Sequence, residues 1–184
     1  MIEAIASWDA QVMLFVQDHL RFEALDPIVR FITALGNAGI FWIILGLLLF
    51  IYKPTRRDSA FCLPTLAIAT IINNLILKRI IMRARPYDVI EGLTIIIERE
   101  NSWSFPSGHA CSSFTMAAAL FFAFRGRGGG WAYIPAVLIA ASRIYVGVHY
   151  PTDIIAAAFV GTSVAIICYF QYKKIKSRHP GMLT

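Results

Sequence analysis

Cysteine is scarce in this chain, and its few cysteines are poorly placed for a covalent or metal-bound framework. The three residues, Cys62, Cys111 and Cys168, all lie in apolar runs. In such runs cysteine usually serves as a small buried side chain. The pattern favours neither a disulfide set nor a metal site, so we expect all three to be core residues.

Acidic side chains are scarce in the most apolar segments. Of the eleven Asp and Glu residues in the chain, Asp153 is the only one within a segment that we expect to span a membrane. A hydrolytic metal site built between facing helices would need more carboxylates. We therefore expect a functional site without a metal and without another cofactor.

Polar residues are too few for an ordinary soluble domain. Hydrophobic residues make up 58% of the 184 residues and the mean hydropathy is +0.63, whereas ~45–50% is typical of soluble domains. The net charge of +6 does not indicate nucleic-acid binding, because the basic residues mark membrane edges and one site. We expect an integral membrane protein of one domain, whose partner is the lipid bilayer.

The N-terminal region lacks the basic segment of a secretory signal, so we expect the first spanning helix to direct insertion. Residues 2–20 combine apolar side chains with Glu3, Asp9 and Asp18, a pattern typical of an amphipathic helix at the membrane interface. Whether this region crosses the membrane stays open at this point. The chain then divides into three parts: residues 1–36 as an N-terminal interfacial helical segment, 37–172 as a transmembrane core, and 173–184 as a basic cytoplasmic tail.

Long uncharged runs predict an all-α integral membrane bundle with about five transmembrane helices. The expected spans are Ala38 to Tyr52, residues 59–77 running into Lys78, Ser107 to Phe124, Trp131 to about Val148, and Pro151 to Tyr172. The chain has no internal repeat, and its oligomeric state does not follow from the sequence. The tryptophans are expected in interfacial belts: Trp8, Trp42, Trp103 and Trp131.

Lysine and arginine in short loops predict the sidedness of the bundle. Basic clusters follow the first, third and fifth expected spans: Lys53, Arg56 and Arg57; Arg125 and Arg127; and the tail from Lys173 to Arg178. With five spans, all three clusters fall on one side, which is then the cytoplasm. The C-terminus is therefore expected inside, and the loop 83–105 with His149 on the outer side of the cell membrane.

Four basic residues break this rule, because Lys78, Arg79, Arg83 and Arg85 fall on the outer side. Such a cluster suggests that an anion binds there. The alternative is ordinary snorkelling of basic side chains to lipid headgroups, and this alternative applies more to Arg79 and Arg83 than to the other two.

The segment from Ser142 to Asp153 places ionisable groups beside apolar runs, where such groups are usually functional. Pro151 suits the first position of a helix, and Asp153 then falls in its first turn. His149 lies four residues before Asp153, close enough for a pair that fixes the imidazole tautomer. The pair suits a nucleophile or a base. The alternative is a histidine and an aspartate that only cap a helix at the interface.

The second histidine, His109, ends the segment Pro106-Ser107-Gly108-His109. Backbone amides at a helix start bind anions readily, and Gly108 allows a close backbone approach. Two histidines at a phosphate site divide naturally into a nucleophile and a general acid.

Together these segments resemble the three-part signature of the type 2 phosphatidic acid phosphatase family. The three parts are Lys78 with Arg85-Pro86, Pro106-Ser107-Gly108-His109, and Ser142-Arg143 with His149 and Asp153. That family includes bacterial lipid phosphatases, glucose-6-phosphatase and vanadium haloperoxidases. The resemblance runs from about Gly36 to Tyr172 and implies a helical core, a metal-independent hydrolase and a phosphohistidine intermediate. This chain differs from six-span members in having no clear span before residue 31.

The resemblance also implies roles for single residues. It makes His149 the nucleophile, Asp153 the group that orients it, and His109 the proton donor to the leaving oxygen. It assigns phosphate binding to five residues: Lys78, Arg85, Ser107, Gly108 and Arg143.

For the substrate, the first hypothesis is undecaprenyl diphosphate, hydrolysed to undecaprenyl phosphate for cell-wall biogenesis. The alternative within phospholipid metabolism is a phosphatidylglycerophosphate or phosphatidate phosphatase, for which the same motifs would serve. A different class is an anion transporter that uses the basic cluster as a binding site. Short spans without a repeat argue against transport.

Overall fold

The computed structural model describes residues 2–124 and 128–178, and this part of the chain is helical with no strand. The long elements are α1 (Ile2–Leu20), α2 (Asp26–Leu35), α3 (Ile40–Ile51), α5 (Cys62–Thr70), α8 (Gly108–Ala123), α9 (Tyr133–Tyr145) and α10 (Pro151–Arg178). The short elements are η1 (Asn37–Gly39), α4 (Lys53–Ser59), the π-helical segment η2 (Ile71–Leu77), α6 (Lys78–Ile81), α7 (Pro86–Val89) and η3 (Gly129–Ala132). The predicted all-α class is confirmed.

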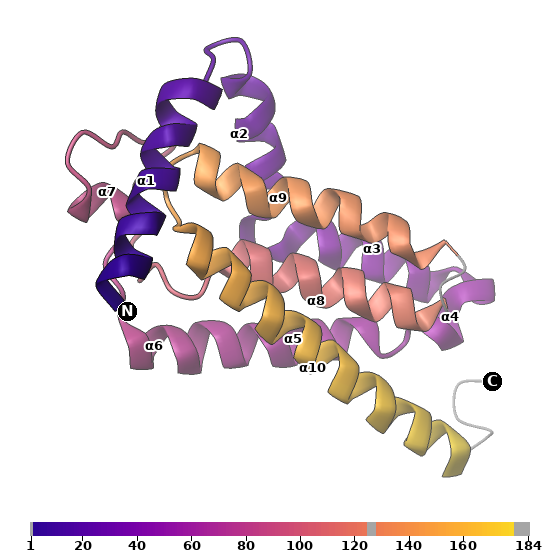
Figure 1. Ribbon diagram of the computed structural model, residues 1–184. Helices are drawn as coiled ribbons and strands as arrows, with labels where there is room; N and C mark the ends of the chain where they lie inside the picture. The colour runs from indigo at the N-terminus through magenta and orange to yellow at the C-terminus, as the bar shows by residue number, and fades with distance from the viewer. Residues whose placement is uncertain (1, 125–127, 179–184) are drawn as a thin grey trace.

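Helix α8 forms the centre of the bundle and packs against α5, α9 and α10 (Figure 1). Its run Ala117-Ala118-Ala119 is fully buried, so small side chains let neighbouring helices come close. On α10, a Cβ atom at Gly161 would lie 2.6 Å from the backbone oxygen of Cys111. This close approach fixes α8 against α10, and these two helices begin at the ends where the predicted His109 and Asp153 lie.

The cysteines and one tryptophan belong to the core. Cys62 and Cys111 are buried and Cys168 is partly buried, all as free thiols, as expected. Trp42 is fully buried in the main apolar cluster, and its Nε1 donates a hydrogen bond to Ser113 Oγ at 2.9 Å. Its predicted place in an interfacial belt is therefore wrong, because α3 turns this ring towards α8 instead of towards the headgroups.

Two helical stretches are long and apolar enough to cross a membrane, Cys62–Val89 and Pro151–Arg178. The pair Asp26–Leu35 and Asn37–Ile51, bent by 49°, would make a third if it forms one broken span. Helix α8 is apolar but has only 16 residues, fewer than the ~20 that cross a bilayer without help. By length and composition, two or three of the described helical stretches could thus cross a membrane, and the count of five spans stays a prediction.

Helix α1 lies across one end of the bundle (Figure 1). Arg21, just after α1, donates hydrogen bonds from Nε to the Tyr145 carbonyl at 2.6 Å and from Nη1 to the Thr94 carbonyl at 2.8 Å. The prediction for α1 was wrong in one respect. Asp9, expected on the exposed polar face, is 0% exposed, because α1 turns it towards the bundle.

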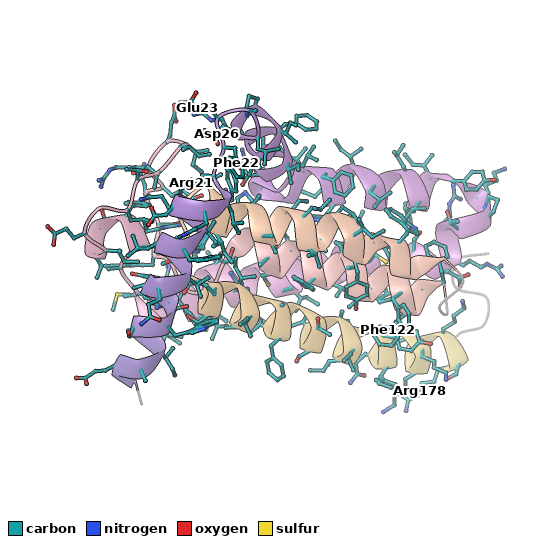
Figure 2. The ribbon with its side chains drawn as sticks, turned by 45° about the horizontal axis from the view of Figure 1, so that its top comes forward. Arg21, Phe22, Glu23, Asp26, Phe122 and Arg178 are labelled. Atoms are coloured by element: carbon teal, nitrogen blue, oxygen red, sulfur yellow. The ribbon has the colours of Figure 1, made fainter. Side chains whose placement is uncertain are left out.

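The opposite end of the bundle carries basic side chains. Helix α10 continues unbroken to Arg178, so the first residues of the predicted tail are helical, and Figure 2 shows Arg178 far from Arg21. Lys176 Nζ lies 3.5 Å from Asp58 Oδ1 of α4, so the basic end of α10 reaches α4 through this ion pair. The predicted cluster at Arg125 and Arg127 falls outside the described residues.

Candidate active site

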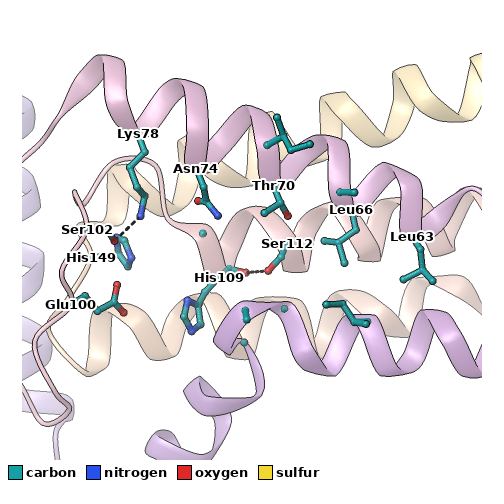
Figure 3. Close-up of a pocket in the computed structure, with 17 residues that line it drawn as sticks. Leu63, Leu66, Thr70, Asn74, Lys78, Glu100, Ser102, His109, Ser112 and His149 are labelled. Carbon is teal, nitrogen blue, oxygen red and sulfur yellow. Dashed lines mark hydrogen bonds between the residues drawn. The ribbon is translucent and has the colours of Figure 1, made fainter.

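The three sequence segments meet at the end of the bundle that α1 crosses. Lys78 lies where η2 passes into α6, and Arg85 directly precedes α7. The Ser107-Gly108-His109 segment opens α8, and His149 lies in the short connection between α9 and α10. Figure 3 shows Lys78, His109 and His149 facing one cavity.

His149 and Asp153 form the predicted pair. Pro151 begins α10, so Asp153 stands in the first turn, and its Oδ2 lies 3.4 Å from Nδ1 of His149. The same oxygen accepts hydrogen bonds from Ser104 Oγ at 2.5 Å and from the Tyr150 amide at 3.0 Å. Both members of the pair are buried. The carboxylate is therefore held in one orientation, with His149 on its Oδ2 side.

The other ring nitrogen of His149 faces an arginine. Nε2 lies 3.2 Å from Nη1 of Arg85, and a guanidinium can only donate hydrogen bonds. Nε2 must therefore be the accepting nitrogen, which leaves the proton on Nδ1 towards Asp153. Burial, together with Arg85 and Arg143, lowers the pKa of His149 well below its ordinary value. At neutral pH the imidazole is uncharged and carries its lone pair on Nε2, as a nucleophile requires. In this structure that lone pair accepts the Arg85 N–H.

His109 stands in the first turn of α8 on the wall of the same cavity. Its Nε2 lies 3.0 Å from Asn37 Oδ1, so the residues that link α2 to α3 hold the ring. Gly36 makes this possible, because a Cβ atom there would collide with the His109 ring. The two histidines therefore reach one cavity from two different helices.

Ser107 and Gly108 have structural parts in this arrangement. Ser107 is buried, and its Oγ accepts a hydrogen bond from the Ala110 amide at 3.4 Å, which caps α8. Gly108 lines the cavity, and a Cβ atom there would lie 3.3 Å from Asn74 Oδ1. Of this pair, the structure brings only Gly108 to the cavity wall.

Arg85 and Arg143 are buried and share one carboxylate. Glu100 Oε2 accepts a hydrogen bond from Arg85 Nη2 at 2.5 Å, and Glu100 Oε1 accepts one from Arg143 Nη2. Arg143 also donates to Thr33 Oγ1 at 2.5 Å, and its Nε has no hydrogen-bond partner within residues 2–124 and 128–178. Both predicted arginines thus contact Glu100, whose side chain is 28% exposed and lines the cavity.

Glu100 was not predicted as part of the site. Burial would raise the pKa of Glu100, but Arg143 and Arg85 outweigh it and lower the pKa to about 2, so the side chain is a carboxylate at neutral pH. The linear sequence gives no sign of this pairing, because Glu100 and Arg143 are 43 residues apart. Ser102 was also missed: its carbonyl accepts a hydrogen bond from Arg85 Nε at 2.8 Å.

Arg83 is a further correction. Snorkelling to headgroups was the alternative that applied more to Arg83 than to Lys78 or Arg85, but the Arg83 guanidinium bridges two buried carboxylates. Nη2 lies 2.7 Å from Asp9 Oδ2 and Nη1 lies 2.7 Å from Asp153 Oδ1. This pairing could not be predicted, because Asp9 was expected on the polar face of an interfacial helix and not beside Arg83.

The cavity has a volume of about 770 Å³ and two chemically different ends (Figure 3). The polar end is lined by Lys78, Glu100, Ser102, His109 and His149, and Leu63 and Leu66 lie towards the other end. Three more apolar residues line the cavity: Ile43, Ala67 and Ile71. Such a cavity suits an amphiphile with an anionic headgroup and a hydrocarbon chain. Over the described ranges, no group of three or more His, Cys, Asp or Glu side chains is arranged to hold a metal ion.

Comparison with known proteins agrees with this chemistry. The family model of the PAP2 superfamily matches residues 59–177. An undecaprenyl-diphosphatase of Sulfolobus acidocaldarius is 29% identical over 78% of this chain and 68% of its own length. A decaprenylphosphoryl-5-phosphoribose phosphatase of Mycobacterium tuberculosis is 33% identical over 91% of this chain and 92% of its own.

A solved structure extends the similarity to the fold. The crystal structure of a PAP2-type phosphatidylglycerolphosphate phosphatase from Bacillus subtilis matches with a TM-score of 0.70 and 26% identity, over 95% of this chain and 87% of that chain. The chain therefore belongs to the PAP2 superfamily of membrane lipid phosphatases.

Proposed function

We propose that this protein hydrolyses undecaprenyl diphosphate to undecaprenyl phosphate and inorganic phosphate. The observation that carries the proposal is the cavity with two histidines at its polar end and an apolar groove leading away from them. The names of two relatives support a polyprenyl substrate, since one is an undecaprenyl-diphosphatase and the other a decaprenylphosphoryl-5-phosphoribose phosphatase. The alternative is phosphatidylglycerophosphate or phosphatidate, which the name of the solved neighbour supports.

The reaction begins with attack on phosphorus by His149. Its Nε2 lone pair forms the N–P bond while the bond to the bridging oxygen breaks, and His109 gives that oxygen a proton. Asp153 stabilises the positive charge that develops on the His149 ring, as the 3.4 Å contact with Nδ1 allows. Water then attacks the phosphohistidine, its proton passes to His109, and phosphate leaves.

Positive charge at the polar end of the cavity binds the phosphoryl oxygens. Arg85 and Arg143 supply forked N–H donors, Lys78 supplies a point charge, and the start of α8 supplies the Gly108 amide, while Ser107 caps that helix. These groups stabilise a pentacoordinate transition state as its charge spreads over the equatorial oxygens. We therefore propose that catalysis needs no metal ion.

Glu100 sets a condition on phosphate binding. Its carboxylate accepts hydrogen bonds from both Arg85 and Arg143. A phosphoryl group that binds these arginines competes with Glu100 for the same N–H groups. We propose that the carboxylate is displaced as substrate enters and returns as phosphate leaves.

We also propose that the site lies on the outer face of the cell membrane in a bundle of five spans. The basic helix α4 and the basic end of α10 lie together at the end opposite the site, and positive charge favours the cytoplasm. Residues 1–36 would then lie at the outer surface beside the core of residues 37–172, and residues 173–184 would form the basic cytoplasmic tail.

A substrate panel in detergent tests the proposed reaction. Phosphate release from undecaprenyl diphosphate should exceed release from phosphatidylglycerophosphate, phosphatidate and diacylglycerol diphosphate at equal concentration, and EDTA should leave the rate unchanged. A faster rate on phosphatidylglycerophosphate would favour the alternative. Loss of activity in EDTA that Mg²⁺ restores would contradict the metal-free mechanism.

Radiolabelled substrate separates the two histidines. His149→Ala should abolish both turnover and the acid-labile, base-stable label on the protein. His109→Ala should lower turnover of the lipid by ~10²–10⁴-fold, but an aryl phosphate with a good leaving group should recover part of the rate. Label that persists in His149→Ala and vanishes in His109→Ala would reverse the two roles.

Replacing Glu100 tests the competition. Glu100→Gln should lower the inhibition constant of vanadate by about tenfold, which corresponds to ~1.4 kcal/mol, because both arginines lose their carboxylate partner. Glu98→Gln, in the same loop, is the matched control. An inhibition constant that is unchanged in Glu100→Gln would show that Glu100 does not compete with the anion.

Cysteine labelling tests the sidedness. In a background without the native cysteines, Glu91→Cys should react with an impermeant thiol reagent in whole cells, because Glu91 is exposed in the loop near the site. Gly130→Cys, exposed at the other end of the bundle, should react only after lysis. The reverse pattern would place the site in the cytoplasm and remove the support for a cell-wall substrate.

A further inference from the structure

Helix α1 contributes a buried carboxylate to the neighbourhood of the His149–Asp153 pair. Asp9 is 0% exposed, although a helix that only rests on the membrane surface would keep its acidic side chains in water. Burying a carboxylate is costly unless it is paired and hydrogen-bonded. The contacts of Asp9 therefore indicate what α1 does in this protein.

The first partner of Asp9 is Thr152, in the first turn of α10. Its Oδ1 accepts a hydrogen bond from the Thr152 amide at 3.1 Å, and its Oδ2 accepts one from Thr152 Oγ1 at 2.5 Å. A carboxylate at the first turn of a helix is favoured by the helix dipole. Asp9 thus ties α1 to the residue directly before Asp153.

The second partner of Asp9 is Arg83, which joins the two carboxylates. One guanidinium nitrogen, Nη2, lies 2.7 Å from Asp9, while the other, Nη1, lies 2.7 Å from Asp153 Oδ1 and 2.7 Å from Thr152 Oγ1. The guanidinium also lies over the Tyr150 ring, 3.7 Å from its centroid. A planar fork held by two carboxylates and a ring has a fixed orientation.

This fork holds the second oxygen of Asp153. Oδ1 accepts from Arg83, while Oδ2 accepts from Ser104 Oγ and the Tyr150 amide and lies towards Nδ1 of His149. Without Arg83 the carboxylate would be held at Oδ2 alone, and without Asp9 the guanidinium would lose one of its two carboxylate anchors. Neither Arg83 nor Asp9 lines the cavity that His109 and His149 share.

We infer that Asp9 and Arg83 are positioning residues that hold Asp153 against His149, so that α1 is part of the catalytic apparatus. This inference rests on the proposed roles of His149 and Asp153. Because neither residue reaches the cavity, their loss acts on the phosphoryl-transfer step and leaves lipid binding unchanged. A displacement of reacting groups by about 1 Å can cost up to ~10²-fold in rate.

The test measures kcat, KM and the rate of phosphoenzyme formation for Asp9→Asn, Arg83→Gln and the double variant. Each single change should lower kcat and the phosphorylation rate by about ten- to a hundredfold, with KM within about twofold of the parent. Since Asp9 and Arg83 act on the same carboxylate, the double variant should lose far less than the product of the two single losses. Two independent losses that multiply in the double variant would overturn the inference.

Matched controls separate positioning from surface charge. Asp18→Asn changes an exposed carboxylate on the same helix, and Arg79→Gln changes an exposed cation near Arg83. Both should keep the parent kcat. A loss in these controls as large as that in Asp9→Asn or Arg83→Gln would overturn the assignment.

A further control separates positioning from docking of α1. Arg21→Gln removes the contacts at the other end of α1, with Tyr145 and Thr94. At an equal fall in unfolding temperature in detergent, Asp9→Asn should lose far more kcat than Arg21→Gln. An equal loss of kcat would mean that Asp9 only holds α1 in place.

His149→Ala keeps this inference separate from the proposed function. If His149→Ala still forms the phosphoenzyme, the proposed function fails, whatever the Asp9 variants show. If His149→Ala loses the phosphoenzyme while Asp9→Asn and Arg83→Gln retain the parent kcat, only the positioning inference fails.

Discussion

Removing a charged side chain from water costs several kcal/mol unless an opposite charge and further hydrogen bonds meet it, and this cost governs the end of the bundle that carries the site. Arg143 is 1% exposed and Asp153 is 0% exposed. Each is met by an opposite charge from a distant part of the chain, Arg143 by Glu100 and Asp153 by Arg83. Both pairs therefore require the segment that contains Arg83 and Glu100 to lie against α9 and α10.

The same pairing organises the chemistry. The Arg83–Asp153 contact fixes the side of His149 that carries its proton, and the Arg85 contact fixes the side that carries its lone pair. Glu100 holds the guanidinium groups of Arg85 and Arg143, and we propose that an anion competes with it for them. Helix packing also supports the arrangement of the site residues. Helices α8 and α10 are in close contact at Gly161, which holds the first turns of both helices at a fixed separation.

The motifs and most helix boundaries were predictable from the sequence, because both depend on neighbouring residues. Proline at the start of α10 and the spacing of His149 and Asp153 gave a pair that the structure confirms. Position by position, the roles of the site residues stay proposals. The substrate class rests on the amphiphilic cavity and on the family.

The parts that escaped prediction depend on contacts between distant residues. Asp9 and Trp42 were assigned to the membrane surface, because composition does not tell which face of a helix meets the bundle. Glu100 carried no local signal at all, since its partners are 15 and 43 residues away. Arg83 could be understood only once Asp9 was placed beside it.

We propose that His149 receives the phosphoryl group between the side chains of Arg85 and Arg143. A crystal structure of the protein with bound vanadate is the decisive measurement. We expect vanadium bonded to His149 Nε2, vanadate oxygens within hydrogen-bond distance of Arg85 and Arg143, and the Glu100 carboxylate moved away from both guanidinium groups. Vanadium bonded to His109, or vanadate held elsewhere with Glu100 still on both arginines, would show that His149 is not the acceptor.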